Sequence, residues 1–156
     1  MPGPIDDEVL VEPLGSDLVA LAQCHALDAS VFPHPSLPAV LGGAPNVLVA
    51  RATAGGPAVG FVATRAGRGV LEIHDLAVAA EQRGRGIGRA LLRAAVASAR
   101  RRGFRAVLLH VSTGNGAALE LYTSEGFRAA RRLRRFYSSP RFADGGDAWE
   151  MVLRLA

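Results

Sequence analysis

The sequence predicts a mixed α/β fold (α+β) in which helices flank both faces of a mixed β-sheet. Short apolar runs of strand length interleave with longer stretches whose apolar residues recur at helical spacing. Their alternation along the chain is typical of such a sheet. A chain of 156 residues, 49% of them hydrophobic, suits one domain with a sizeable core. We therefore expect a single domain over residues 1–156.

Turn residues separate the elements of the first half of the chain. The helix at 17–29 is stopped by Phe32-Pro33, because proline restricts the backbone of the residue before it. Gly55-Gly56-Pro57 is a hairpin-type break between two apolar runs, and Gly67-Arg68-Gly69 makes a second turn. The elements expected here are strands at 9–13, 46–52, 58–65 and 70–79 and the helix at 17–29.

The second half begins with a strongly patterned helix. Ile87, Leu91 and Ala95 share one face, and arginines at 100–102 followed by Gly103 are the cations and the glycine expected at a helix C-terminus. Shorter apolar and helical runs follow it. The elements expected here are helices at 86–102 and 115–125 and strands at 106–111, 127–136 and 148–155.

A glycine-rich turn lies between the strand at 70–79 and the helix after it. Gly84, Gly86 and Gly88 remove side chains where backbone N–H groups can gather at a helix N-terminus. Such a terminus is the usual place to hold a phosphate. The turn is therefore a candidate site for a phosphorylated cofactor, although glycines in a turn also have a purely structural explanation.

The spacing excludes two other phosphate-binding loops. The chain contains no lysine, so a P-loop ending in Gly-Lys-Ser/Thr does not exist. The glycines read G-x-G-x-G, whereas the dinucleotide fingerprint needs G-x-G-x-x-G and an acidic residue about 20 positions further on. In this chain the arginine-rich residues 100–105 occupy that region.

A second group of polar residues follows the strand at 106–111. In a helix that begins at Asn115, this residue, Ala118 and Tyr122 lie at i, i+3 and i+7 and share a face. Asn115 suits the N-cap and Gly126 the left-handed residue that ends the helix. A plain cap and a half-buried aromatic are the structural alternatives for Asn115 and Tyr122.

The two motifs together resemble the GNAT superfamily of acyl-CoA-dependent N-acyltransferases. Arg83-x-x-Gly86-x-Gly88 is similar to its pyrophosphate signature Q/R-x-x-G-x-G/A, and N-x-x-A-x-x-L-Y-x-x-x-G-F at 115–127 to its second block. The resemblance implies a mostly antiparallel sheet of about six to seven strands flanked by about four helices. Within the family, the chain looks most like the protein N-terminal acetyltransferases, including the ribosomal-protein alanine subgroup.

The resemblance also implies the residues of the cofactor and acceptor sites. The cofactor is acetyl-CoA, a co-substrate, and no metal is expected. Backbone groups of Leu76, Ala77 and Val78 would flank the pantetheine, and Asn115 and Ala118 would contact the cofactor beside Tyr122. The acceptor would meet Phe32, Pro33 and Tyr137. The residues expected around the pyrophosphate are Arg83, Gly84, Arg85, Gly86, Ile87, Gly88 and Arg89.

Acetyl transfer to an amine needs a base and a donor to the leaving thiolate. The resemblance implies Tyr122 as the acid and offers His110 or Glu72 as the base, and the residues do not decide between them; His74 and Asp75 are weaker candidates. A lysine amine is about 0.04% neutral at pH 7 and an α-amine roughly 10–15%. A histidine is a base strong enough only for the second, which favours protein or peptide N-termini.

Two other functions remain open. One is acetylation of a small-molecule amine, such as a polyamine, an aminoglycoside or an amino acid, and the other is non-catalytic binding of acyl-CoA.

Composition indicates the partners and the compartment. The formal charge of +4 suits an anionic cofactor, and scattered arginines with few aromatics between them disfavour nucleic acid. One cysteine, an N-terminal segment without signal features and no membrane-length apolar run favour a cytoplasmic protein that does not bind a membrane. A homodimer is an open alternative to a monomer.

Overall fold

The computed structural model describes residues 9–31, 46–137 and 145–156. Its Cα positions group into two compact units, and the chain passes between them three times, after residues 66, 72 and 98. The first unit comprises residues 1–66 and 73–98, and the second comprises 67–72 and 99–156. The expectation of a single domain over residues 1–156 stays a prediction.

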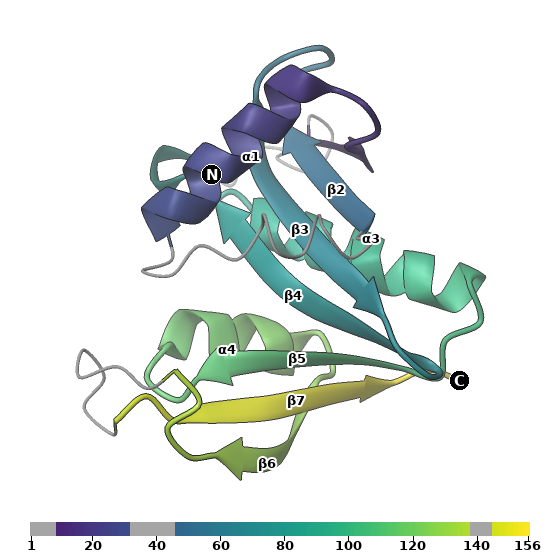
Figure 1. Cartoon of the computed structure of the whole chain (residues 1–156), viewed down its shortest axis with the longest axis vertical. Helices are drawn as coiled ribbons and strands as arrows, with labels where there is room; N and C mark the ends of the chain where they lie inside the picture. The colour runs from purple at the N-terminus through teal and green to yellow at the C-terminus, as the bar shows by residue number, and fades with distance from the viewer. Residues whose placement is uncertain (1–8, 32–45, 138–144) are drawn as a thin grey trace, which may run out of the picture. The chain divides into compact units, whose positions relative to one another are not determined.

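In the described residues, seven strands are hydrogen-bonded in the order β1-β2-β3-β4-β5-β7-β6. Figure 1 shows the ribbon and labels most of these strands. The pairs β1–β2, β2–β3, β5–β7 and β6–β7 are antiparallel, which confirms the expected mostly antiparallel α/β fold. The strands are β1 (Leu10–Pro13), β2 (Asn46–Arg51), β3 (Ala58–Ala66), β4 (Val70–Val78), β5 (Ala106–Ser112), β6 (Arg128–Leu133) and β7 (Ala148–Arg154).

The described parts of the chain hold three α-helices and one short 3-10 helix, slightly fewer α-helices than the four or so expected. The 3-10 turn is an addition to the expected elements and lies between the strand and the glycine-rich turn. These helices are α1 (Leu18–Val31), α3 (Ile87–Arg101), α4 (Gly116–Ser124) and the 3-10 helix η1 (Ala80–Gln82). In none of the described segments is a helix long and apolar enough to cross a membrane.

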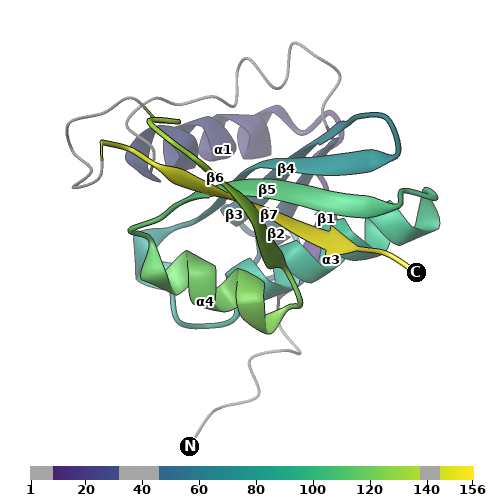
Figure 2. The ribbon, with the colours of Figure 1, turned by 90° about the horizontal axis from the view of Figure 1, so that it is seen from below.

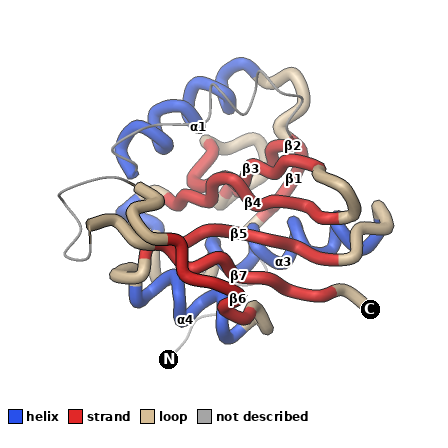
Figure 3. The backbone as a smooth tube through the Cα atoms, turned by 60° about the horizontal axis from the view of Figure 1, so that its bottom comes forward, coloured by secondary structure: helices blue, strands red, loops and turns tan. Residues whose placement is uncertain are grey.

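In the first unit, α1 and α3 cover opposite faces of the strands (Figure 3). The face toward α1 has a core in which Cys24 of the helix packs with Val49 and Phe61 of the strands. On the other face, a Cβ on Gly60 would lie 3.1 Å from Leu91 Cδ1 and 3.3 Å from Ile87 Cγ2. Glycine at position 60 thus lets the start of α3 approach β3 closely.

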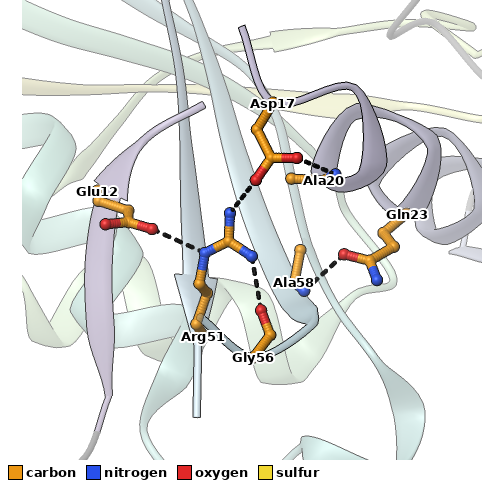
Figure 4. Close-up of polar contacts among 7 residues, drawn as sticks. All are labelled: Glu12, Asp17, Ala20, Gln23, Arg51, Gly56 and Ala58. Atoms are coloured by element: carbon orange, nitrogen blue, oxygen red, sulfur yellow. Dashed lines mark hydrogen bonds and ion pairs between the residues drawn. The ribbon is translucent and has the colours of Figure 1, made fainter. Parts of the chain in front are cut away.

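Arg51 joins three segments of the first unit (Figure 4). Its Nε donates to Glu12 of β1 at 2.7 Å, and its Nη2 donates to Asp17 at 2.8 Å. Its Nη1 donates to the Gly56 carbonyl in the turn between β2 and β3. Asp17 also accepts from the Ala20 amide at 2.9 Å, so it caps α1 while it pairs with Arg51.

In the second unit, β7 lies between β5 and β6, and α4 lies along one face of these strands (Figure 2). Leu109, Val111 and Met151 are buried on this face, together with Tyr122 and Phe127. In the pairing of β6 with β7, Ala129 is opposite Met151 and Arg131 is opposite Glu150. Ala130 is therefore the extra residue of a β-bulge.

The strand expected at 127–136 ends earlier, at Leu133. Arg135 has a φ of 52°, in the left-handed region that does not continue a strand. Its amide donates to Asp147 Oδ1 at 2.9 Å, and the Tyr137 amide donates to the Gly146 carbonyl at 2.9 Å. A turn held by Asp147 thus replaces the last residues of the expected strand.

Candidate active site

The glycine turn of the first unit has the backbone that anion binding requires. Gly84 and Gly86 have φ values of 77° and 79°, and a Cβ on either would have no atom within 4 Å. Both positions therefore need glycine for conformation and face open space. The first helical hydrogen bond of α3 runs from the Ala90 amide to the Gly86 carbonyl, at 3.0 Å. The amides of Gly86, Ile87 and Gly88 thus have no acceptor within the helix, as at any helix N-terminus.

Arginines surround this turn. Arg83 Nε donates to the carbonyl of Val78, the last residue of β4, at 3.3 Å, and Arg85 donates to Gln82 at 3.3 Å. Arg89 lies in the first turn of α3, where Ile87 is buried and fixes the helix start. Open glycines, helix amides and guanidinium groups together fit a pyrophosphate.

The end of β4 alternates strictly between buried and half-buried residues. Ala77 is buried in the core toward α1, whereas Leu76 and Val78 are half-buried. Glu72 and His74 share the half-buried face, and Asp75 shares the buried face with Ala77. The alternation therefore separates Asp75 from the carboxylate of Glu72.

Asn115 is the N-cap of α4 in the second unit, since its Oδ1 accepts from the Ala118 amide at 3.2 Å. The cap uses the oxygen of the amide, so the nitrogen of the same exposed side chain is the group that would meet a ligand. Capping and ligand contact are compatible at this position.

Tyr122 is buried in α4, 9% exposed, with its ring 6.0 Å from that of Phe127. Burial, and to a smaller extent the neighbouring Tyr137, raises the pKa of Tyr122 to about 12. The phenol therefore stays protonated at any physiological pH and can act as a hydrogen-bond donor.

His110 lies at the centre of the polar residues on the other face of the second unit. Its Nε2 is 3.1 Å from Glu150 Oε2, and its Nδ1 is 4.0 Å from Glu72 Oε1. The ring of Phe136 lies 4.7 Å from its ring, tilted by 36°. The two base candidates of the sequence are thus neighbours, and the imidazole lies between two carboxylates.

Glu150 and Arg131 are functional candidates that no sequence motif indicates. Arg131 donates to both oxygens of Glu150, at 3.1 Å each, and Glu150 is opposite His110 in the strand register. The pKa of Glu150 is lowered, first by the hydrogen bond from Arg131 and also by that from His110, against the effect of burial. The sequence signal that could have indicated Glu150 is its position as a charged residue within the apolar run at 148–155.

Tyr137 belongs to the same group of residues. Its ring meets that of Phe136 edge to face at 5.0 Å, and it is the neighbour that acts on the Tyr122 phenol. Phe32 and Pro33, the other expected acceptor contacts, lie outside the described residues.

Each unit therefore holds one part of the expected site. The second unit brings Glu72 beside His110 and Tyr137 near Tyr122, and it holds Asn115 and Ala118 at the start of α4. The first unit holds residues 76–78 and 83–89, and His74 and Asp75. Within the described segments, no group of histidine, cysteine and acidic side chains has the geometry of a metal site.

Comparison with known proteins identifies relatives of the chain. The family model described as Acetyltransferase (GNAT) family matches residues 18–127. The N-alpha-acetyltransferase RimI of Mycobacterium tuberculosis is 36% identical over 138 residues, which are 83% of each chain.

Solved structures share the fold. The ribosomal-protein-S18-alanine N-acetyltransferase of Escherichia coli has a TM-score of 0.81 at 22% identity, over 95% of this chain and 94% of that one. A GNAT family acetyltransferase of Elizabethkingia anophelis with acetyl-CoA bound has a TM-score of 0.82 at 20% identity, over 96% and 99%.

Proposed function

The chain belongs to the acetyltransferase (GNAT) family and is an acetyl-CoA-dependent N-acetyltransferase, and from this premise we propose that its acceptor is the α-amine of a protein or peptide N-terminus. The observation that carries the proposal is the placement of His110, a weak base, between the carboxylates of Glu72 and Glu150. The Mycobacterium tuberculosis relative, whose name describes an N-alpha-acetyltransferase, supports it.

The strength of the base favours an α-amine. An α-ammonium of pKa 7.7–8.0 is within about 1.5 units of an ordinary histidine, whereas a lysine ammonium is about 4 units away. A histidine can therefore take the proton from an α-ammonium directly or through water, and the neutral amine can then attack. The carboxylate of Glu72, 4.0 Å from the ring, would attract the cationic form of the acceptor.

On the cofactor side, the amides of residues 84–89 and the guanidinium groups of Arg83, Arg85 and Arg89 would hold the pyrophosphate. Leu76, Ala77 and Val78 would flank the pantetheine through backbone groups, and the Asn115 amide nitrogen and Ala118 would contact the cofactor near Tyr122. Acetyl-CoA supplies a thioester carbonyl and a thiolate leaving group. The Tyr122 hydroxyl would donate a hydrogen bond to the charge that develops on sulfur.

We propose direct transfer without an acetylated enzyme. Cys24, the one cysteine of the chain, is fully buried in the core toward α1. Burial raises the pKa of the Cys24 thiol to about 11, so the nucleophilic thiolate is scarce. The Cys24→Ser variant is expected to keep turnover within about twofold, and an acetylated Cys24 found by mass spectrometry would contradict this part of the proposal.

A panel of acceptors tests the function. CoA release is measured with peptides that have free N-terminal amines, with the same peptides blocked at the N-terminus but containing lysine, and with polyamines, aminoglycosides and free amino acids. Turnover on free N-termini alone is expected. Because the chain has no lysine, background acetylation of the enzyme is restricted to its own N-terminus. Turnover on small amines without turnover on peptides would overturn the proposal in favour of the small-molecule alternative.

A pair of glycine variants tests the cofactor site. Gly86→Asp places a carboxylate and a disfavoured backbone beside the pyrophosphate, so acetyl-CoA affinity measured by calorimetry is expected to fall by at least about 100-fold. Gly55→Asp is the matched control, because Gly55 has a φ of 71° and an equally open Cβ position in the turn between β2 and β3. Equal affinity of the two variants for acetyl-CoA would show that the glycine turn does not bind the cofactor.

We propose a cytoplasmic enzyme that works without a membrane or nucleic acid. A single cysteine, kept as a thiol, suits a reducing compartment. Light scattering on the purified protein distinguishes a monomer from the homodimer.

A further inference from the structure

We propose that Glu150 is a positioning residue that holds His110 in the Nε2–H tautomer, so that Nδ1, on the side of Glu72, is the atom that takes the proton from the acceptor amine. The inference rests on the proposed function for the identity of the acceptor. It assigns the role of base to His110 and leaves Glu72 to orient the ammonium group.

The contact between His110 and Glu150 determines the position of the ring proton. An ionised carboxylate has no hydrogen to donate, so across the 3.1 Å between Nε2 and Oε2 the imidazole must be the donor. A neutral imidazole carries one N–H, and with the hydrogen on Nε2 the lone pair is on Nδ1. A residue on the neighbouring strand thus selects which nitrogen accepts a proton.

Arg131 keeps Glu150 ionised and in place. The guanidinium donates through Nε to Oε1 and through Nη2 to Oε2, both at 3.1 Å, a two-point contact that fixes the plane of the carboxylate. Oε2 is shared between Arg131 and His110. The side chain of Glu150 is 14% exposed, so little solvent competes for these contacts.

The charged groups around His110 suit a cationic acceptor. Among the described residues, Glu72 on β4 and Glu150 on β7 are acidic groups beside the ring. Arg131 on β6 pairs with Glu150, and the ring of Phe136 lies beside that of His110. At 4.0 Å, Nδ1 and Glu72 Oε1 are too far apart for a hydrogen bond to each other. Both are acceptors, so a group that donates to the two of them must carry more than one N–H or O–H, as an ammonium or a water does.

The proton balance is simple. The α-ammonium gives one proton to Nδ1 and becomes the neutral amine, and His110 becomes imidazolium, with N–H groups toward Glu150 and Glu72. Attack on the thioester carbonyl forms the amide and releases the thiolate. The second proton of the attacking nitrogen passes to water as the amide forms. The imidazolium gives its proton to the thiolate, directly or through water, which restores the thiol and the neutral ring.

Nuclear magnetic resonance tests the tautomer without any turnover. Long-range ¹H–¹⁵N spectra of the ¹⁵N-labelled protein distinguish a protonated from an unprotonated ring nitrogen, and the His110→Gln spectrum assigns the signal among the four histidines. At a pH where the ring is neutral, the wild type is expected to carry the proton on Nε2. In Glu150→Gln, whose amide can also donate, a mixture of tautomers is expected. A proton on Nδ1 in the wild type, or no change in the variant, would overturn the inference.

Kinetics test the consequence for the reaction. Glu150→Gln is expected to lower kcat about tenfold with an unchanged KM for acetyl-CoA, because the ring nitrogen that accepts the proton is no longer selected. Glu150→Asp keeps a carboxylate that can accept from Nε2 and is expected to restore part of the lost kcat. An unchanged kcat in Glu150→Gln contradicts the proposed role.

Arg131 provides a variant that does not disturb a buried side chain, since it is 65% exposed. Arg131→Gln is expected to lower kcat about threefold and to shift the populations of the two tautomers in the same direction as Glu150→Gln. Arg128→Gln, a change of the same charge on the same exposed strand, is the control and is expected to leave both unchanged. Equal effects of the two variants would show that Arg131 acts only through the net charge of the protein and not through its contact with Glu150.

The two proposals can fail separately. If the wild type acetylates no peptide, the proposed function fails, and the tautomer spectra still decide the role of Glu150.

Discussion

Tyr122 is the residue whose chemistry the structure changes most. With ordinary pKa values, transfer of a proton from a phenol to a thiolate of pKa about 8.5 is uphill by roughly 2 kcal/mol. In the folded protein burial raises the pKa of Tyr122 to about 12, so the same transfer is uphill by about 5 kcal/mol. A hydrogen bond to sulfur is therefore favoured over a full proton transfer.

Removal of this hydroxyl should affect the chemical step alone. Tyr122→Phe is expected to lower kcat about 100-fold and to leave the KM for acetyl-CoA within about threefold. Because the phenol is protonated below a pKa of about 12, the rates of the wild type should show no decrease from its ionisation up to pH 10. Steady-state kinetics over this pH range check both statements, and full turnover by the variant would contradict the role.

Cys24 is expected to be inert in the native protein. With its pKa raised to about 11, roughly 0.1% of the thiol is ionised at pH 8, and the side chain is fully buried. An aromatic disulfide reagent should react with the native protein at least about 100-fold more slowly than with the protein in guanidinium chloride. The chain has one cysteine, so the reaction needs no assignment. Equal rates would show that the core of the first unit opens readily.

At the scale of elements, the contact of α3 with β3 depends on a missing side chain. A Cβ on Gly60 would lie 3.0 Å from the Ala77 carbonyl and 3.1 Å from Leu91. Gly60→Ala is expected to cost about 1–3 kcal/mol of unfolding free energy in urea and to weaken acetyl-CoA binding, because the start of α3 must move. Gly116→Ala, at an open helical position, should be neutral or stabilising. Equal stability of the two variants would contradict the close packing.

The start of α1 should make stability depend on pH. The pKa of Asp17 is lowered from 3.8, first by the Ala20 amide and also by Arg51. A lowered pKa means that the folded state binds fewer protons, so this contribution is complete above pH 3.8 and is lost as the pH falls through the folded value. Asp17→Asn keeps the cap but removes the charge. Urea midpoints from pH 5 to pH 2.5 should fall less steeply in this variant than in the wild type.

Local sequence signals predicted most elements to within one or two residues, because apolar spacing, glycines and caps act over a few positions. The row formed by Arg131, Glu150 and His110 could not be predicted in this way. These residues come from three strands, and which side chains are cross-strand neighbours depends on the register of the pairing. A slip of one residue would turn every side chain of a strand to the other face of the sheet. The end of β6 was missed for a related reason, since the Arg135 amide binds Asp147, which is distant in sequence and lies just before β7.

At the scale of the whole molecule, two short motifs were enough to predict the family, its fold and its cofactor. Each motif lies within a few consecutive positions, so it is visible in one sequence. The acceptor has no such motif. Of the residues expected to contact the acceptor, Tyr137 lies beside Phe136. Selectivity for a peptide or for a small amine depends on side chains from several elements, which no short motif contains.

Binding of acetyl-CoA should stabilise the whole chain. At a concentration of 100 times Kd, a ligand that binds only the folded state adds about 2.7 kcal/mol, which corresponds to a rise in Tm of roughly 5–10 °C for a chain of this size. Differential scanning fluorimetry of the wild type and of Gly86→Asp checks this, and the variant should show almost no shift. A similar rise in both would indicate binding elsewhere.

The bulge at Ala130 selects which side chain of β6 meets Glu150. In a regular strand continued from Ala129, Ala130 would stand opposite Glu150, and Arg131 would stand opposite Trp149 on the other face. One additional residue on an exposed edge strand therefore moves every later side chain of that strand to the opposite face of the sheet. Relatives that differ by a single insertion or deletion here would differ in the polarity beside the ring on β5, even with every other residue of the site identical.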